Sequence, residues 1–215
     1  MSSDNTERGR VLQTTEPILD PRGVVNVETR PLADRIGSLE GQTVGFLDNA
    51  KTNADNFLDE VARVLRDEYG VAETINRRKS NTAIPADSIA TYLDEHCDAV
   101  VNAYGDCGSC TSWCVYDSVD LEKRGTPVAT INSDEFVRLG QSESRSLGMP
   151  GLPLITVTHP MGDVPEEVVR KRARDAVPEI VRVLTSEPAA LAEEFEGKYL
   201  GANEELQDEE LYCPL

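Results

Sequence analysis

Two cysteines, spaced as Cys107-Gly-Ser-Cys110, directly follow a short β-branched run that ends in Gly105-Asp106. The run at residues 99–103 predicts a buried strand, and the sequence after the motif predicts a helix. The two thiols therefore belong to a strand-to-helix turn, where the first N–H groups of a helix are unpaired and carry partial positive charge. That charge favours a thiolate, which can be a nucleophile, a redox partner or a metal ligand.

The spacing of these cysteines has a redox interpretation. A Cys-x-x-Cys motif at the start of a helix allows a disulfide within the first turn, with one attacking thiol and one resolving thiol. Thioredoxin-type proteins place the motif after a strand of a mixed sheet, so a parallel sheet would share only the local chemistry. The chain has 5 cysteines, and this odd number argues against a framework of structural disulfides.

A metal site is the competing interpretation of the same residues. Cys107, Cys110 and Cys114 are spaced as CxxCxxxC, and structural zinc would need a fourth ligand. The candidates for that ligand are Cys97, His159 and Cys213. An iron–sulfur cluster is a second metal alternative. Because the chain has no second CxxC, we predict no bound cofactor or metal and keep zinc and iron–sulfur as alternatives.

Alternating strand and helix patterns surround the cysteines. Short apolar runs predict strands, and longer amphipathic segments predict helices. The expected strands are residues 44–48, 72–76, 99–103, 127–131 and 153–158. The expected helices are residues 54–69, 86–95, 109–123, 134–139 and 165–184, the last with a kink at Pro178. This alternation predicts a single three-layer α/β domain, flavodoxin-like or Rossmann-like, with about five parallel strands in the order 2-1-3-4-5.

In this strand order, the loops after strands one, three and five meet at the carboxyl edge of the sheet, where α/β folds bind ligands. These loops are residues 48–53, 105–110 and 159–162. Lys51 and His159 are therefore candidate catalytic residues, which would lower a thiol pKa or donate a proton. The candidate substrate-binding residues are Asn49, Asn53, Asp106, Ser109 and Thr111.

Several residues near the motif also have a structural interpretation. Capping of the following helix is the more frequent role for an asparagine placed like Asn53, and Ser109 and Thr111 are good capping residues. We expect Trp113 and Tyr116 to pack their helix onto the sheet.

The composition predicts a strongly acidic surface around such a site. The 215 residues include 39 Asp and Glu against 21 Lys and Arg, for a formal net charge of −18. Such a surface repels nucleic acid and anionic lipid, and it resembles the surfaces of proteins from a salt-rich cytoplasm. The chain has a polar N-terminus and no long apolar segment, which predicts a cytoplasmic protein without membrane association.

The chain divides into three segments by composition and pattern. We expect an extended N-terminal arm at residues 1–37, an α/β domain at residues 38–186 and an acidic C-terminal tail at residues 187–215. This length is sufficient for one sizeable core. The sequence leaves the oligomeric state open, and an oligomer is compatible with it.

The motif residues resemble one protein family. The segments GDCGSCTSWCVYD, VGFLDNAKTNAD, RRKS near residue 79 and LPLITVTHP are similar to the UGSC family of (seleno)proteins, over about residues 38–185. In some members of that family, selenocysteine stands at the position of Cys107. The resemblance implies that Cys107 attacks and Cys110 resolves. A more distant similarity is to the selenocysteine-bearing subunits of glycine and proline reductases, which reductively cleave a carbon–heteroatom bond.

These patterns together predict a thiol-dependent oxidoreductase that acts on a small-molecule substrate. Cys107 attacks the substrate, Cys110 forms the Cys107–Cys110 disulfide, and an external dithiol, such as a thioredoxin-like electron donor, reduces it again. Two alternatives stay open. One is a lyase or hydrolase with Cys107 as its covalent nucleophile. The other is a metal-binding structural or sensor protein that uses Cys107, Cys110 and Cys114.

Overall fold

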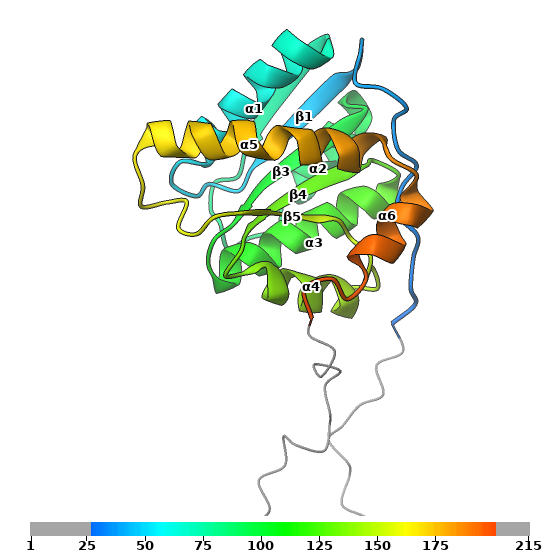
Figure 1. Cartoon of the computed structure of the whole chain (residues 1–215). Helices are drawn as coiled ribbons and strands as arrows, with labels where there is room; N and C mark the ends of the chain where they lie inside the picture. The colour runs from blue at the N-terminus through cyan, green and yellow to red at the C-terminus, as the bar shows by residue number, and fades with distance from the viewer. Residues whose placement is uncertain (1–26, 201–215) are drawn as a thin grey trace, which may run out of the picture.

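A parallel sheet forms the centre of the protein (Figure 1). The computed structural model describes residues 27–200. The strands are β1 (Thr43–Asp48), β2 (Glu73–Arg78), β3 (Ala99–Gly105), β4 (Val128–Ser133) and β5 (Leu154–Val157). Their order is β2-β1-β3-β4-β5, and all neighbouring strands run parallel. The predicted α/β class and strand order are confirmed, and the architecture is flavodoxin-like.

Within residues 27–200, six helices connect and cover these strands. They are α1 (Ala54–Tyr69), α2 (Asp87–His96), α3 (Gly108–Arg124), α4 (Val137–Ser146), α5 (Glu166–Thr185) and α6 (Pro188–Phe195). Helices α1 and α5 pack together over one face of the sheet, and α2, α3 and α4 cover the other (Figure 1). The sheet is therefore the middle of three layers, as predicted.

Alternation of side chains along the strands divides the core between these two faces. Phe46 of β1 belongs to the apolar cluster that includes Phe57 of α1. The next residue, Leu47, belongs to a second cluster with Leu93 of α2, because successive side chains of a strand point to opposite faces. Strand β3 is buried along its whole length, as expected for the central strand of a covered parallel sheet. The motif cysteines thus follow the most enclosed strand of the fold.

Element boundaries differ from the predicted ones by a few residues. Strand β2 extends to Arg78, and α4 begins only at Val137 because residues 134–136 form a turn. Helix α5 continues through Pro178, and the predicted kink at that residue stays a prediction.

The described parts of both terminal segments lie against the domain. Residues 27–37 form no helix or strand, yet Leu32 within them is buried. The segment that the sequence analysis assigned to an acidic tail begins with α6, whose Leu191 and Phe195 are in the core. The folded body therefore continues beyond residue 186, where the domain was predicted to end. Residues 1–26 of the predicted arm and 201–215 of the predicted tail lie outside the described residues.

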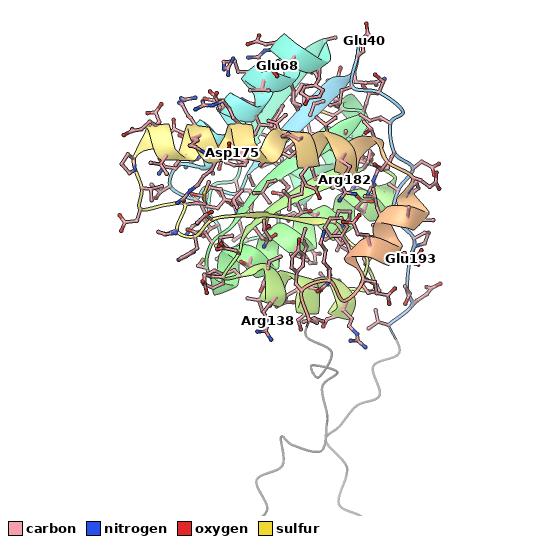
Figure 2. All side chains as sticks on the ribbon, in the orientation of Figure 1. Glu40, Glu68, Arg138, Asp175, Arg182 and Glu193 are labelled. Atoms are coloured by element: carbon pink, nitrogen blue, oxygen red, sulfur yellow. The ribbon has the colours of Figure 1, made fainter. Side chains whose placement is uncertain are left out.

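Charged side chains cover the outer faces of the helices (Figure 2). Glu68 of α1, Asp175 of α5 and Glu193 of α6 are exposed examples. Arg182 of α5 binds Glu194 of α6 at 2.7 Å, which fastens these two helices together. No helix within residues 27–200 is both long enough and apolar enough to cross a membrane.

Candidate functional site

The two motif cysteines lie within the first turn of α3. Cys107 occupies the N-cap position, and its sulfur accepts a hydrogen bond from the backbone N–H of Cys110 at 3.4 Å. The Cys110 thiol donates to the carbonyl of Cys107 at 3.3 Å and accepts from the N–H of Asp106 at 3.2 Å. Both sulfurs thus lie beside the unpaired amides of the helix N-terminus, which stabilise negative charge.

The two thiols differ in exposure and in acidity. Cys107 is half-buried, whereas Cys110 is buried. Partial burial raises the pKa of Cys107, but hydrogen bonds from Cys110 and the charge of Lys51 outweigh it, so this pKa lies below its usual range. Burial raises the pKa of Cys110 to about 11, and the neighbouring Cys107 contributes to the increase. The outer sulfur is therefore the more acidic of the two, and the inner sulfur holds its proton more tightly.

Lys51 provides positive charge near the dithiol. It lies half-buried in the loop between β1 and α1, and its charge acts to lower the pKa of both Cys107 and Cys110. The carbonyl of Lys51 accepts the N–H of Ala54 at 3.1 Å, which fixes the loop where α1 begins. This position is compatible with the role predicted for Lys51 as a thiolate stabiliser.

Hydrogen bonds join the three loops at the carboxyl edge of the sheet. The Tyr104 hydroxyl near the end of β3 donates to the carbonyl of Thr52 in the β1–α1 loop. The Asn53 amide donates to the carbonyls of Met161 and Val164 in the β5–α5 loop, at 3.2 and 3.1 Å. The structure thus brings together the three loops that the sequence analysis placed at one edge.

Asp106 connects the dithiol turn to the β5–α5 loop. Its carboxylate accepts from His159 Nδ1 at 2.8 Å and from the N–H groups of Met161 and Gly162 at 3.2 and 3.3 Å. Because a carboxylate oxygen accepts hydrogen bonds, this contact assigns a proton to Nδ1 and leaves Nε2 outside the pair. In the described part of the chain, the His159 ring bonds to Asp106 and Ser133 and to no sulfur, which leaves thiolate stabilisation to Lys51.

The two asparagines predicted to bind substrate bond to the backbone instead. Asn49 is fully buried, donates to the Tyr104 carbonyl at 2.7 Å and accepts from the Tyr104 N–H at 3.2 Å. Asn53 precedes α1 in a left-handed conformation, with φ of 68°, and its side chain makes no capping hydrogen bond. The expected capping by the Asn53 side chain is therefore wrong. Both amides hold loops in place, and substrate binding by either of them stays a prediction.

Ser109 and Thr111 occupy different environments on α3. Ser109 is exposed, and its hydroxyl lies 4.0 Å from the Cys107 sulfur. Thr111 is fully buried, and its hydroxyl has no hydrogen-bond partner within residues 27–200; neither have the amide atoms of Asn132 on β4. A Cβ atom on Gly105 would lie 2.7 Å from the Thr111 hydroxyl and 2.4 Å from the Asn132 amide nitrogen. Only glycine at position 105 allows this close approach, and only Ser109 of the pair is open to a substrate.

Of the two aromatic residues of α3, Tyr116 does not pack as predicted, whereas Trp113 is half-buried and its packing onto the sheet stays a prediction. Trp113 and Tyr116 contact each other edge to face, with ring centroids 5.4 Å apart, and Tyr116 is 39% exposed. The prediction that Tyr116 packs α3 onto the sheet is therefore wrong. The buried side of α3 instead includes polar residues such as Asp117, whose carboxylate binds the buried ammonium of Lys79 at 2.7 Å.

Cys114 does not complete a metal site with the motif cysteines. Its thiol lies 4.0 Å from the carbonyls of Asn102 and Ile131, and burial raises its pKa well above the usual range. Residues 27–200 contain no group of three or more His, Cys, Asp or Glu side chains arranged to hold a metal ion. The three-cysteine metal site therefore has no geometric support in this part of the chain, and Cys213, one of the candidate fourth ligands, lies outside the described residues.

Tyr104, Asn132 and Lys79 are site or supporting residues that sequence reasoning missed. Tyr104 and Asn132 belong to no motif, and the available signal was their position near the carboxyl ends of β3 and β4. Lys79 lies in the RRKS segment, but no local pattern shows that it pairs with a residue 38 positions away.

The residues at the β1/β3 edge do not fit FMN, which flavodoxin-like folds bind there. Asp48 at the end of β1 is buried and accepts from the N–H of Ala50 at 2.7 Å and from Arg78 at 2.5 Å. A carboxylate thus uses the loop amide that a flavin phosphate would need, and the carboxylate also occupies the nearby Arg78 guanidinium. The bond between Tyr104 and Thr52 uses a further part of the same loop.

Comparison with known proteins gives a family match by sequence and distant likenesses by structure. The sequence model of the UGSC family matches residues 17–186. A flavodoxin-like domain from a Synechococcus sp. protein has 12% identity and a TM-score of 0.38, and the match covers 66% of this chain and 98% of that chain. A diflavin flavoprotein A3 from Nostoc sp. has 14% identity and a TM-score of 0.37, with 67% and 96% covered. No curated protein matches the chain.

Proposed function

The chain belongs to the UGSC family, and from that premise we propose that it is a thiol-dependent oxidoreductase that reduces or reductively cleaves a small substrate. The observation that carries the proposal is the difference between the two motif thiols. Cys107 is half-buried with a lowered pKa, whereas Cys110 is buried with a pKa of about 11. An attacking thiol reacts as the thiolate, and a resolving thiol is needed only after a mixed disulfide has formed.

A small disulfide, RS–SR′, is the simplest substrate for this pair. The Cys107 thiolate attacks one sulfur, so that a Cys107–SR bond forms and R′S⁻ leaves. Cys110 then loses its proton and attacks the Cys107 sulfur, so that the Cys107–Cys110 disulfide forms and RS⁻ leaves. The dithiol has lost one pair of electrons to the substrate, and the proton of Cys110 passes to a leaving thiolate. An external dithiol reverses the oxidation of the protein.

We assign supporting roles to the residues around the dithiol. Lys51 stabilises the Cys107 thiolate by its charge. His159, held by Asp106 at 2.8 Å, donates a proton to the leaving group when its ring is protonated. Ser109, with its exposed hydroxyl 4.0 Å from Cys107, contacts the bound substrate.

The cellular setting is part of the same proposal. The protein works in the cytoplasm, where dithiol reductants keep such cysteines reduced. A thioredoxin-like protein is the proposed electron donor, and the reaction uses no bound cofactor. The net charge of −18 favours a small molecule over nucleic acid as substrate.

Intact-mass measurement tests the proposed dithiol. The wild-type protein should lose one pair of hydrogens with diamide and regain them with dithiothreitol. Cys107→Ser and Cys110→Ser should each abolish this change, and Cys97→Ser, a half-buried cysteine outside the site, should keep it. With bis(2-hydroxyethyl) disulfide, Cys110→Ser should accumulate a mixed disulfide on Cys107. The same reversible oxidation in Cys110→Ser would contradict the proposed pair.

The Asp106–His159 pair favours a second candidate function. A cysteine nucleophile in a lyase or hydrolase uses a histidine that a carboxylate orients, and the 2.8 Å contact provides such a histidine. In that case Cys107 acts alone, so Cys110→Ser keeps turnover and Cys107→Ser loses it. The oxidoreductase loses multiple turnover in both variants, and this difference separates the two functions.

A further inference from the structure

We propose that Arg172 of α5 is a positioning residue for His159, because it fastens the β5–α5 loop on both sides of the imidazole. The effect on catalysis rests on the proposed function, whereas the effect on the geometry of the ring is independent of it. Arg172 lies outside every motif that the sequence analysis identified, and it contacts the loop from α5.

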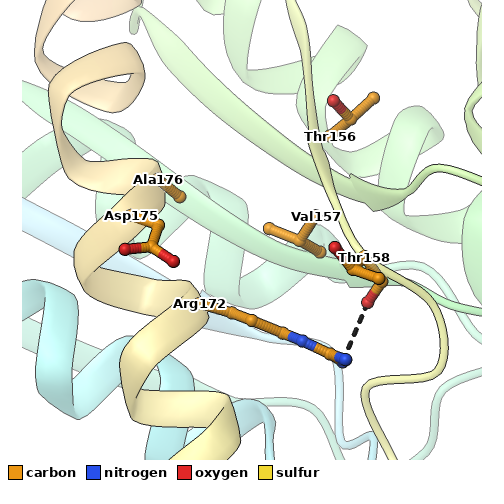
Figure 3. Close-up of a pocket in the computed structure, with 6 residues that line it drawn as sticks. All are labelled: Thr156, Val157, Thr158, Arg172, Asp175 and Ala176. Carbon is orange, nitrogen blue, oxygen red and sulfur yellow. Dashed lines mark hydrogen bonds between the residues drawn. The ribbon is translucent and has the colours of Figure 1, made fainter.

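The guanidinium of Arg172 makes three contacts with the loop. Its Nη1 atom donates to the carbonyl of Thr158 at 2.9 Å and to the carbonyl of Pro160 at 2.5 Å, and it lies 3.7 Å from the Met161 sulfur. Figure 3 shows the side chain reaching from α5 across to Thr158. Since Thr158 and Pro160 are the two neighbours of His159, these bonds fix the backbone on either side of the ring.

A cavity lies beside this contact, between β5 and α5 (Figure 3). Its volume is about 130 Å³, and Arg172 forms part of its wall. The other lining residues are Thr156, Val157, Thr158, Asp175 and Ala176. Side chains do not fill this space, so apolar packing between β5 and α5 is incomplete here. The hydrogen bonds of Arg172 therefore hold the loop where packing does not.

Asp106 holds the same loop through different atoms. Its carboxylate binds the His159 ring at 2.8 Å and the N–H groups of Met161 and Gly162 at 3.2 and 3.3 Å. The loop is therefore held by an arginine on α5 and an aspartate next to the dithiol, and Asn53 binds it beyond the ring through Met161 and Val164. Loss of the guanidinium removes the bonds to the two neighbours of His159, so the ring is no longer kept in one orientation toward Asp106.

One more bond acts on His159 itself. Its backbone N–H donates to the Asp134 carboxylate at 2.9 Å, and this bond remains when Arg172 is changed. We therefore expect the loop to stay folded but to sample more than one ring orientation.

Imidazole NMR tests the geometric part of the proposal, because the chain has only 2 histidines. In the wild type, ¹⁵N shifts should show the Nδ1–H tautomer of His159 with a proton that exchanges slowly. Arg172→Met should replace this with averaged signals and fast proton exchange, as Asp106→Asn should, while His96 stays unchanged. Lys171→Met, which changes an exposed ion pair on the same helix, is the matched control and should alter neither ring.

Arg172→Lys provides a second variant that keeps the positive charge. A lysine ammonium can donate to both carbonyls from one nitrogen, as Nη1 does, but its side chain is one bond shorter, so we expect His159 signals between those of the wild type and Arg172→Met. This variant also decides the matter if Arg172→Met does not fold. Wild-type His159 signals in folded Arg172→Met, or in Arg172→Lys if only that variant folds, would overturn the proposal.

A kinetic measurement separates this proposal from the proposed function. Reduction of bis(2-hydroxyethyl) disulfide should slow about tenfold in Arg172→Met and depend less on pH, since a displaced acid transfers its proton less efficiently. Alkylation of Cys107 by iodoacetamide should keep its wild-type rate. If the wild type does not reduce the disulfide while the NMR result is as expected, the proposed function fails and the positioning role stands. If the wild type is active and Arg172→Met has the same reduction rate and the same His159 signals, the positioning role is rejected and the proposed function stands.

Discussion

The two ends of helix α3 both carry ionisable side chains, and they use them in opposite ways. In the C-terminal half, Asp117 binds the Lys79 ammonium at 2.7 Å and Glu122 binds the Arg35 guanidinium at 2.9 Å. All four side chains are at most 2% exposed. These pairs fasten the β2–α2 loop and the N-terminal segment to α3, and they have no access to a substrate.

The N-terminal turn pairs its groups but leaves one member of each pair, Cys107 and His159, partly open to solvent. Cys107 is half-buried, and the His159 ring, bonded to Asp106, is 33% exposed. If one member of a fully buried pair loses its charge, the other is left as an unpaired buried charge, which is costly. Groups at an edge can exchange protons and reach a substrate. The comparison teaches that exposure, more than residue type, separates the reactive end of α3 from its structural end.

Removal of one charge from a buried pair should have the largest effect. Asp117→Asn leaves the Lys79 ammonium buried without a counter-charge, and we expect a loss of about 3 to 5 kcal/mol in the free energy of unfolding. Asp120→Asn, which changes a partly exposed pair with Arg124 on the same helix, should cost less than about 1 kcal/mol. Urea unfolding measures both. Equal losses would show that burial does not distinguish these acids.

A methyl group at the reactive turn should have the next largest effect. In Gly105→Ala the new Cβ would lie 2.4 Å from the Asn132 amide nitrogen of β4 and 2.9 Å from the Thr111 Cα of α3, so β3 and α3 must move apart. We expect a loss of about 1 to 3 kcal/mol in stability and an altered rate of Cys107 alkylation. Gly108→Ala is the matched control, because no atom lies within 4 Å of its added Cβ. Thermal unfolding that ranks the two variants equally would contradict the close packing behind the dithiol.

Neutralisation of the loop cation should change reactivity without changing the fold. Lys51→Met removes a charge that lowers the pKa of Cys107, so the thiolate needs a higher pH to form. The rate of iodoacetamide alkylation near neutral pH should fall by about two- to tenfold. The rate-against-pH curves of the wild type and Lys51→Met should meet at high pH, where Cys107 is ionised in both proteins.

A second lysine provides the control for that measurement. Lys123 lies in the last turn of α3 and donates to the carbonyl of Leu147 at 3.0 Å. Lys123→Met should leave the alkylation curve in place. A curve that shifts equally in both variants would mean that net charge, and not the position of Lys51, controls the thiol.

The smallest expected effect concerns an unpaired hydroxyl. Thr111→Val removes a buried oxygen that has no partner within residues 27–200, so we expect stability to rise by up to about 1 kcal/mol. Thr130→Val removes a buried hydroxyl that donates to Ser118 at 2.8 Å, and this change should lower stability. Chemical denaturation of Thr111→Val and Thr130→Val should give changes in the free energy of unfolding of opposite sign. Changes of the same sign would contradict the difference in hydrogen bonding.

The strand order and the meeting of three loops were predictable from the sequence because both follow from local periodicity and general connection rules. The position of Cys107 and Cys110 at the start of a helix was predictable for the same reason. The role of Asn49 was not, because it depends on Tyr104, which is 55 residues away. Helix α6 was missed because its acidic composition resembles a tail, and only the docking of Leu191 and Phe195 in the core makes it part of the fold.

The sulfur-bound amides at the start of α3 have a consequence for isotope exchange. The N–H of Cys110 donates to the Cys107 sulfur, and the N–H of Asp106 donates to the Cys110 sulfur. A bond between the two sulfurs changes both acceptors at once, so deuterium uptake at these amides should differ between the reduced and oxidised protein. A peptide that spans the turn would then report the oxidation state of the dithiol through its backbone, without any reagent on sulfur.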